Sequence, residues 1–172
     1  LNRPIDEICA EASSAGVVVP ANYNAVEQTV ISGEVSGVEQ AMELAKAAGA
    51  KRAIRLNVSG AFHSPLMESA TSGLESALQS AGWSDPLVPV FSNVTAQPVS
   101  GSEMARDLLL RQLTSPVRWV SVVRAMAAAY PTATFVEMGP GNVLTGLLKR
   151  LAPDRAAMTC GTVAEVEALL AS

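Results

Sequence analysis

The sequence predicts an α/β protein made of two parts, a small α+β subdomain over residues 1–60 and a longer α/β segment over residues 61–172. Two observations support this division. Before residue 60, short stretches of alternating apolar residues lie between two helical patterns. After residue 63, longer helical patterns alternate with apolar strands, an order typical of α/β folds.

The first part begins with a helix. Apolar residues recur at helical spacing over residues 5–13, and a second helix opens with the capping-box pattern Ser36–Glu39 and closes at Gly49. The expected elements in order are the helix over 5–13, strands over 17–20 and 29–32 joined by a polar connection over 21–28, the Ser36 helix, and a strand over 53–58. A ferredoxin-like unit has the order strand, helix, strand, strand, helix, strand. This part therefore fits such a unit without its first strand.

The second part alternates helices and strands over greater lengths. The expected elements are a helix over 65–80, a strand over 86–94, a Leu-rich helix opened by the pattern Ser100–Glu103, a helix restarted at Ser115-Pro116, a strand over 132–138, a helix over 142–151, and a last helix opened by a Thr162–Glu165 capping box. We find no internal repeat or low-complexity segment.

The composition excludes several function classes. The 172 residues carry a net charge of −4 with a pI near 5.0, which argues against nucleic acid as the main partner. No apolar run reaches the length of a membrane span, and no charged-then-apolar leader opens the sequence. Two cysteines provide neither a disulfide framework nor a CxxC metal pattern, so we expect no metal site. These features predict a cytoplasmic protein that binds neither membranes nor nucleic acid.

The only histidine, His63, lies at the junction of the two parts. The expected strand over 53–58 leads into a small, flexible corner, and Ser64 and Pro65 are residue types that start helices. We therefore expect His63 on a strand-to-helix turn, where the positive end of the helix dipole favours a neutral imidazole. A neutral imidazole accepts a proton, as a general base must. A single histidine is also a common capping or packing residue, and this pattern by itself leaves both roles open.

Three other stretches carry candidate polar groups. Asn22, Asn24 and Gln28 cluster in the expected connection, where amides serve either as turn formers or as ligands. Gln112 follows Arg111 at the end of the Leu-rich helix, a pattern that also fits an ordinary helix C-terminus. The glycine-rich stretch over 137–146 turns into a helix and resembles a phosphate cradle. Because it lacks the Lys and the spacing of a P-loop, we interpret it as a structural turn.

Lys51, Arg52 and Arg55 form a basic cluster just before the His63 turn. A solvated strand end explains them simply. The functional alternative is a surface on which an acidic partner protein docks, steered by charge.

Taken together, five segments resemble the C-terminal part of the malonyl-CoA:acyl carrier protein transacylase family, which is related to the acyltransferase domains of polyketide synthases. Their order and separation match as well, so the resemblance covers essentially the whole chain. The segments are Asn22-Tyr-Asn24 through Gln28-Thr-Val-Ile-Ser-Gly33, Ala48-Gly-Ala-Lys-Arg52, Gly60-Ala-Phe-His-Ser-Pro-Leu-Met67, Arg111-Gln-Leu through Pro116-Val-Arg-Trp119, and Glu137-Met-Gly-Pro-Gly-Asn-Val-Leu-Thr-Gly146.

The resemblance implies a ping-pong transfer of malonyl from coenzyme A, through a serine ester, to the phosphopantetheine thiol of acyl carrier protein. His63 matches the family's catalytic histidine, and Gln112 matches the residue whose main-chain carbonyl orients that histidine. The resemblance also places Asn22, Asn24 and Gln28 among the substrate-binding residues. The coenzyme A thioester and the phosphopantetheine are both substrates, so no cofactor is implied.

Phe62 is the residue directly before the histidine. In the related acyltransferase domains, Phe at this position accompanies malonyl and a small residue accompanies methylmalonyl, because the ring fills the space of an α-methyl branch. The resemblance therefore implies a preference for malonyl, with Phe62 at the substrate.

The family's Gly-His-Ser-Leu-Gly elbow, its malonyl-binding arginine and its Gly-Gln-Gly loop have no counterpart in these residues, and Ala25-Val26 replaces a common Ser-Pro. We therefore expect a fragment of the enzyme: most of a ferredoxin-like subdomain, then the last part of an α/β-hydrolase-like subdomain. Its partners would be malonyl-CoA, acyl carrier protein and the missing N-terminal part of the same enzyme. The alternatives are a non-catalytic carrier-protein-binding module and an acyltransferase domain of a polyketide synthase.

Overall fold

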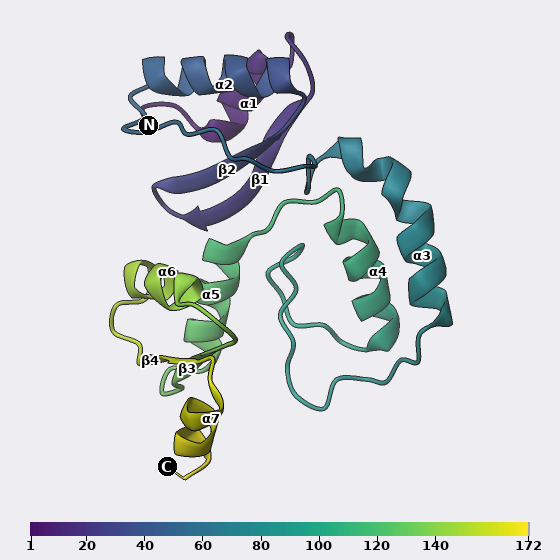
Figure 1. Cartoon of the computed structure of the whole chain (residues 1–172), viewed down its shortest axis with the longest axis vertical. Coiled ribbons are helices and arrows are strands. Elements are labelled where there is room, and N and C mark those ends of the chain that lie inside the picture. The colour runs from purple at the N-terminus through teal and green to yellow at the C-terminus, as the bar shows by residue number, and fades with distance from the viewer. Residues whose placement is uncertain (172) are drawn as a thin grey trace. The chain divides into compact units, whose positions relative to one another are not determined.

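A computed structural model describes residues 1–171 of the chain and shows a mixed α/β protein (Figure 1). The chain divides into two compact units, Leu1–Trp119 and Val120–Ser172. The first unit includes residues 1–60, for which we predicted a subdomain of their own. The predicted boundary at residue 60 stays a prediction, because the two units describe only how this chain divides in the absence of other polypeptide.

The N-terminal part of the first unit is a helix, a hairpin and a helix. The elements are α1 (Ile5–Ala12), β1 (Val18–Ala25), β2 (Gln28–Gly33) and α2 (Val35–Ala47). β1 and β2 pair antiparallel, and α1 and α2 contact each other and the hairpin. The prediction of two helices and two strands here is confirmed.

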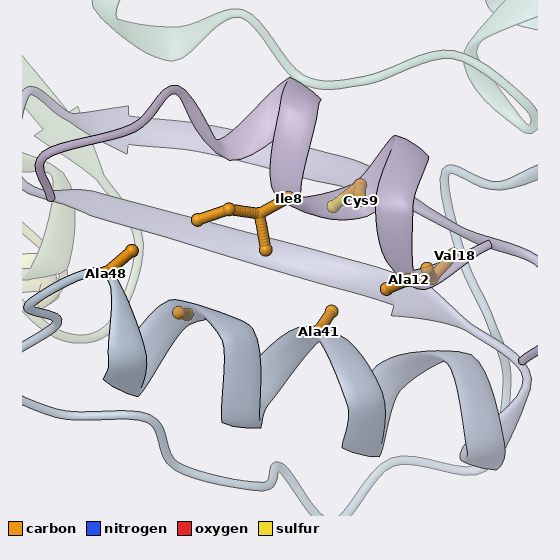
Figure 2. Close-up of a cluster of buried hydrophobic side chains, with 7 residues drawn as sticks. Ile8, Cys9, Ala12, Val18, Ala41 and Ala48 are labelled. Atoms are coloured by element: carbon orange, nitrogen blue, oxygen red, sulfur yellow. The ribbon is translucent and has the colours of Figure 1, made fainter. Parts of the chain in front are cut away.

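The core of this part consists mostly of small residues. Figure 2 shows Ile8 of α1 pointing between the two helices, with alanines of α2 facing it. Small side chains let helix and strand backbones approach closely, and burying them still removes apolar surface from water. The buried cluster is Ile8, Cys9, Ala12, Val18, Ala41, Ala45 and Ala48.

Residues 21–28 are not the polar connection that we predicted. Asn22 and Asn24 belong to β1, and the turn is confined to Val26 and Glu27, between paired Ala25 and Gln28. The prediction failed because asparagine favours turns in isolation, whereas here the ladder to β2 stabilises an extended backbone.

The predicted strand over 53–58 does not form in this structure. Within residues 1–171 this segment belongs to no helix or strand, and Ile54, Leu56 and Val58 are exposed by 65%, 54% and 66%. The alternation of apolar and polar residues is the pattern of a half-buried strand. A strand also requires a neighbour for its backbone hydrogen bonds, and the pattern alone does not provide one.

The next segment leads from the His63 turn into two helices. The predicted helix over 65–80 is confirmed in extent, but its first turns form a 3-10 helix, η1 (Pro65–Ala70), before α3 (Thr71–Ser80). The predicted strand over 86–94 is wrong, because it leaves a single bridge between Phe91 and Pro98 among the described residues. Pro86 and Pro89 lack the N–H donors that a strand ladder needs.

α4 (Ser102–Gln112) begins with a different cap from the predicted Ser100–Glu103 box. The Asp85 carboxylate accepts hydrogen bonds from the Ser102 amide at 2.8 Å and from the Ser102 hydroxyl at 2.9 Å. The side chain of Asp85, 17 residues earlier in the sequence, therefore caps α4 in place of the predicted Ser100–Glu103 pair. The Ser36 box is likewise absent: Ser36 donates to the Ala15 carbonyl at 2.8 Å, and α2 starts at Val35.

The second unit holds a short parallel sheet. β3 (Phe135–Met138) pairs with β4 (Ala157–Cys160), and α6 (Val143–Leu151) contacts both strands. α5 (Trp119–Ala129) precedes them, and α7 (Val163–Leu170) follows with the predicted Thr162–Glu165 capping box. The predicted strand is confirmed but is three residues shorter, and the three predicted helices are confirmed, except that α5 begins at Trp119 rather than at Ser115-Pro116. β4 was not predicted. None of the helices in residues 1–171 has the length and apolar character that a bilayer crossing needs.

Candidate active site

His63 lies in a tight turn with an unusual backbone. Its φ of 62° falls in the left-handed region, which costs a residue with a side chain about 1–3 kcal/mol. The His63 amide donates to the Leu113 carbonyl at 3.1 Å, which ties the turn to the C-terminus of α4. The side chain is half-buried. Contacts from a distant segment therefore stabilise the strained conformation.

The imidazole ring is oriented by a main-chain carbonyl. His63 Nδ1 lies 2.9 Å from the Gln112 carbonyl oxygen, which can only accept a hydrogen bond. Nδ1 must therefore carry the proton. The Gln112 side-chain Nε2 lies 3.4 Å from the same Nδ1, but it is also a donor and instead bonds the Ser115 carbonyl at 2.8 Å. In the neutral ring, this assignment leaves His63 Nε2 without a proton and able to accept one.

The predicted pair His63 and Gln112 is thus brought together across 49 positions of sequence. The neutral carbonyl fixes the ring and its tautomer, and it would stabilise a protonated imidazole less than a carboxylate would. The arrangement suits a base that takes a proton and soon returns it. It is the geometry of a general base with an open Nε2.

Phe62 lies beside the histidine in the same turn. Its ring packs on the backbone of Gly60, where an added Cβ would lie 3.1 Å from a ring carbon. The side chain is 51% exposed, so a large apolar face is available next to the base. Phe62 is placed where it could contact a substrate that reaches His63.

The three amide residues lie on the hairpin. Asn22 pairs with Val30 of β2 and bridges Val117 on the other edge of β1, and Asn24 lies at an irregularity in the β1–β2 register. Gln28 is exposed at the start of β2, opposite Ala25.

Tyr23, between the two asparagines, donates its hydroxyl to Asp6 of α1 at 2.7 Å. Burial and this bond raise the pKa of Tyr23 above its usual range.

One segment connects the hairpin to the histidine. We define the connecting segment as residues 112–118. Its Val117 accepts from the Tyr23 amide at 2.9 Å and donates to the Ala21 carbonyl at 2.8 Å, and Arg118 donates to the Asn93 carbonyl at 3.0 Å. Gln112, at its start, orients His63. The sequence foresaw Gln112 through the resemblance but not Val117, whose role depends only on backbone atoms.

The glycine-rich turn lies in the second unit and agrees with the structural interpretation. The Glu137 carboxylate accepts from the Thr145 amide at 2.7 Å and from the Leu144 amide at 3.0 Å, and these bonds lower the pKa of Glu137. Gly139 and Gly141 adopt φ values of 113° and 101°, which favour glycine. The Glu137 carboxylate therefore already takes the Leu144 and Thr145 amides, two of the donors that a phosphate cradle would use.

Two other features bear on the site. Arg55 forms an ion pair with Glu39 at 3.1 Å, whereas Lys51 and Arg52 are exposed and form no ion pair with the residues that the structure describes. Among residues 1–171, no group of three or more His, Cys, Asp or Glu side chains is placed to hold a metal ion.

Comparison with known proteins identifies similar chains. A family model described as an acyl transferase domain matches residues 5–167. The malonyl CoA-acyl carrier protein transacylase of Bacillus subtilis (strain 168) is 44% identical over 151 residues, which are 88% of this chain and 46% of that protein. This chain thus spans about half the length of the curated relatives it matches, and it matches their C-terminal portion.

Solved structures give the same result. The acyl-carrier-protein S-malonyltransferase of Burkholderia pseudomallei 1710b superposes with a TM-score of 0.91 at 39% identity, over 98% of this chain and 54% of that chain. A malonyl-transacylase in complex with a type II polyketide synthase acyl-carrier protein superposes with a TM-score of 0.91 at 37% identity, over 100% of this chain and 56% of that chain.

Proposed function

This chain belongs to the acyl transferase family, and on that premise we propose that it is the histidine-bearing part of a malonyl-CoA:acyl carrier protein transacylase. The observation that carries the proposal is the His63 ring, held through Nδ1–H by the Gln112 carbonyl with Nε2 left as a base. The similarity to relatives named for this activity supplies the substrates, malonyl-CoA and acyl carrier protein.

The proposed reaction has two half-reactions. In the first, His63 Nε2 takes the proton of a serine hydroxyl while the serine oxygen attacks the malonyl thioester carbonyl. The C–S bond breaks, and the departing coenzyme A sulfur receives that proton from His63. In the second, Nε2 takes the proton of the carrier protein's phosphopantetheine thiol, and the sulfur attacks the serine ester. The serine oxygen leaves and takes the proton back.

We propose that the serine and the oxyanion hole are contributed by polypeptide outside these 172 residues. No serine of this sequence stands in a Gly-x-Ser-x-Gly pattern, and the relatives are about twice as long. These residues alone would then be inactive, because a base without its nucleophile cannot complete the transfer. No cofactor enters the proposal, since both thiol carriers are substrates.

A thiol leaving group explains why a neutral orienting carbonyl suffices. A thiol is more acidic than an amine and departs more readily, so the imidazolium is needed less as an acid than in a peptidase. The Gln112 carbonyl fixes the tautomer and the ring without a buried charge.

Phe62, Asn22, Asn24 and Gln28 complete the proposed site. Phe62 would exclude an α-methyl branch, and the three amides on the hairpin would contribute to substrate binding, Asn22 from the edge of β1 that bridges Val117. We assign the pathway to fatty acid biosynthesis. Polyketide synthesis is the second candidate, because one similar malonyl-transacylase is in complex with the acyl-carrier protein of a type II polyketide synthase.

The finer fold and the compartment are proposals as well. The helix–hairpin–helix part would be a ferredoxin-like subdomain completed by a strand from the rest of the protein, and residues 61–172 would close an α/β-hydrolase-like subdomain. Two free, buried thiols fit a reducing cytoplasm.

Intact-mass spectrometry of the full protein that carries this chain tests the function. Incubation with malonyl-CoA should add one malonyl unit, and added carrier protein should remove it. A His63→Ala variant should acquire the unit far more slowly, whereas Glu167→Gln on α7 should behave as wild type. An unmodified wild-type protein, or a His63→Ala variant as fast as wild type, would contradict the proposal.

A further inference from the structure

Ser64 is a buried polar residue next to the proposed base. Its side chain is 0% exposed, and among residues 1–171 no other polar residue is classed as buried. A hydroxyl buried this fully is retained only when its hydrogen-bonding capacity is satisfied. What the Ser64 hydroxyl bonds to therefore indicates its purpose.

The hydroxyl closes the turn that contains His63. Ser64 Oγ donates to the Ala61 carbonyl at 2.6 Å and accepts from the Leu66 amide at 3.3 Å. Phe62 and His63 are the two residues between the hydrogen-bonded ends, Ala61 and Ser64. One hydroxyl therefore fixes the backbone before the turn to the first turn of the helix after it.

His63 requires such support because its φ of 62° is unfavourable for a residue with a side chain. The contacts of its own amide and ring are both to the neighbouring α4 end, at Leu113 and Gln112. Without the Ala61–Ser64 bond, the turn could relax toward an ordinary φ and carry Nδ1 away from the Gln112 carbonyl. The ring would then lose its fixed tautomer.

We propose that Ser64 is a positioning residue for the transfer reaction, holding His63 in the left-handed turn so that Nδ1–H meets Gln112 and Nε2 stays a base. The proposal rests on the proposed function of His63. It goes beyond the capping role that Ser64 also has at η1. Capping uses only the bond from Leu66, whereas positioning uses the bond to Ala61.

The test combines nitrogen NMR of the His63 ring with steady-state kinetics in the full protein that carries this chain. The His63 signal is the one that disappears in a His63→Asn variant. In wild type the ring should be the Nδ1–H tautomer. In Ser64→Ala, and in Ser64→Cys, which keeps the volume and hydrogen-bonds only weakly, the two tautomers should mix. We expect kcat to fall about 10- to 100-fold with little change in KM for malonyl-CoA.

Thr162→Ala is the matched control. The Thr162 hydroxyl also donates to one group and accepts from a backbone amide, at the start of α7, so its loss reproduces a lost cap without touching His63. Ser64→Thr keeps the hydroxyl. In this variant kcat should fall in proportion to the loss of the Nδ1–H tautomer of His63.

The proposal is overturned if folded Ser64→Ala or Ser64→Cys keeps the wild-type tautomer, or if kcat falls without a change in the ring. Failure of the underlying function gives a different result. Wild-type protein would then transfer no malonyl, while the ring measurement would still report what Ser64 does to His63.

Discussion

At the scale of single residues, the proposed chemistry depends on two neighbours in one turn. Phe62 and His63 share the strained stretch between Ala61 and Ser64, so the base and the exposed aromatic ring are positioned by the same hydrogen bonds. A change in the turn should alter both the proton transfer and the choice of acyl group. A change confined to the Phe62 side chain should alter the choice alone.

Replacing Phe62 should therefore relax acyl specificity. In the full protein, Phe62→Ser removes the ring that is 51% exposed beside His63 and opens space for an α-methyl branch. We expect the malonyl to methylmalonyl ratio of kcat/KM to fall roughly tenfold or more, the range that one methyl group commands in a shaped pocket. Leu66→Ala, at an exposed position after the turn, is the control and should leave the ratio unchanged. An unchanged ratio in Phe62→Ser would remove Phe62 from the specificity site.

At the scale of elements, α2 meets the loop that precedes β1 through two glycines. A Cβ on Gly37 of α2 would lie 2.3 Å from the Gly16 carbonyl oxygen, a distance that the backbone must move to relieve. We expect Gly37→Ala to lower the free energy of unfolding by about 1–3 kcal/mol, as overpacking does.

Gly73→Ala on α3 is the matched control, because no atom lies within 4 Å of its added Cβ. It should stabilise the protein by roughly 0.5–1 kcal/mol through helix propensity. Urea titration of both variants gives the sign of each change in the free energy of unfolding. Equal changes in the two variants would contradict the close approach of Gly37 to the Gly16 carbonyl.

The start of α6 should give a pH-dependent stability. Its Thr145 and Leu144 amides hold the pKa of Glu137 below the ordinary value, so the ionised carboxylate stabilises the folded state at neutral pH. That contribution is present above the unfolded-state pKa and is lost as the pH falls through the folded-state pKa. Glu137→Gln should thus be less stable than wild type at pH 7, and the gap in urea midpoint should close progressively as the pH falls below the ordinary carboxyl range. A gap that stays constant as the pH is lowered would assign the loss to something other than this charge, and Glu167→Gln provides the surface control.

The segment over 53–58 should become a strand when it has a neighbour. Ile54, Leu56 and Val58 are exposed in this chain, but their alternation with polar residues is still the pattern of a half-buried strand. In the full protein we expect their amides to exchange hydrogen slowly, at rates closer to those of β1 than of the Val26–Glu27 turn. Fast exchange throughout the segment would contradict the proposed completion of the ferredoxin-like subdomain.

At the scale of the whole molecule, local and non-local structure were predictable to different degrees. Helices such as α1 and α7 followed from spacing and capping, because each helix satisfies its own backbone. Strands were predicted less reliably. Among residues 1–171, the 53–58 segment pairs with no strand and the 86–94 segment keeps only the bridge between Phe91 and Pro98. β4 forms because β3 pairs with it.

The site divides in the same way. A turn at His63 followed from the residues around it, whereas the bond to Gln112, 49 positions away, was expected only from the family resemblance. The hydrogen bonds of Val117 to β1 and the burial of Ser64 depend on backbone atoms and on packing, which the type of a residue does not predict.

The proposed docking of a carrier protein depends on the charge of the whole molecule. The chain is acidic overall, with a net charge of −4, so an acidic partner would be steered only by a local positive surface. Lys51 and Arg52 are exposed, whereas Arg55 is already paired with Glu39, so the first two are the residues to reverse. Lys51→Glu with Arg52→Glu should raise KM for carrier protein roughly 3- to 10-fold at low salt, given about 0.2–1 kcal/mol for each surface charge pair.

The same double variant should leave the rate of malonyl loading from coenzyme A unchanged. Added salt should narrow the difference in KM for carrier protein between variant and wild type, because it screens the surface charges. Lys149→Glu with Arg150→Glu, on α6, is the matched control for total charge. If both double variants raise KM equally, the effect is that of net charge. If the Lys51 and Arg52 variant slows both half-reactions equally, these residues act on the active site rather than on docking.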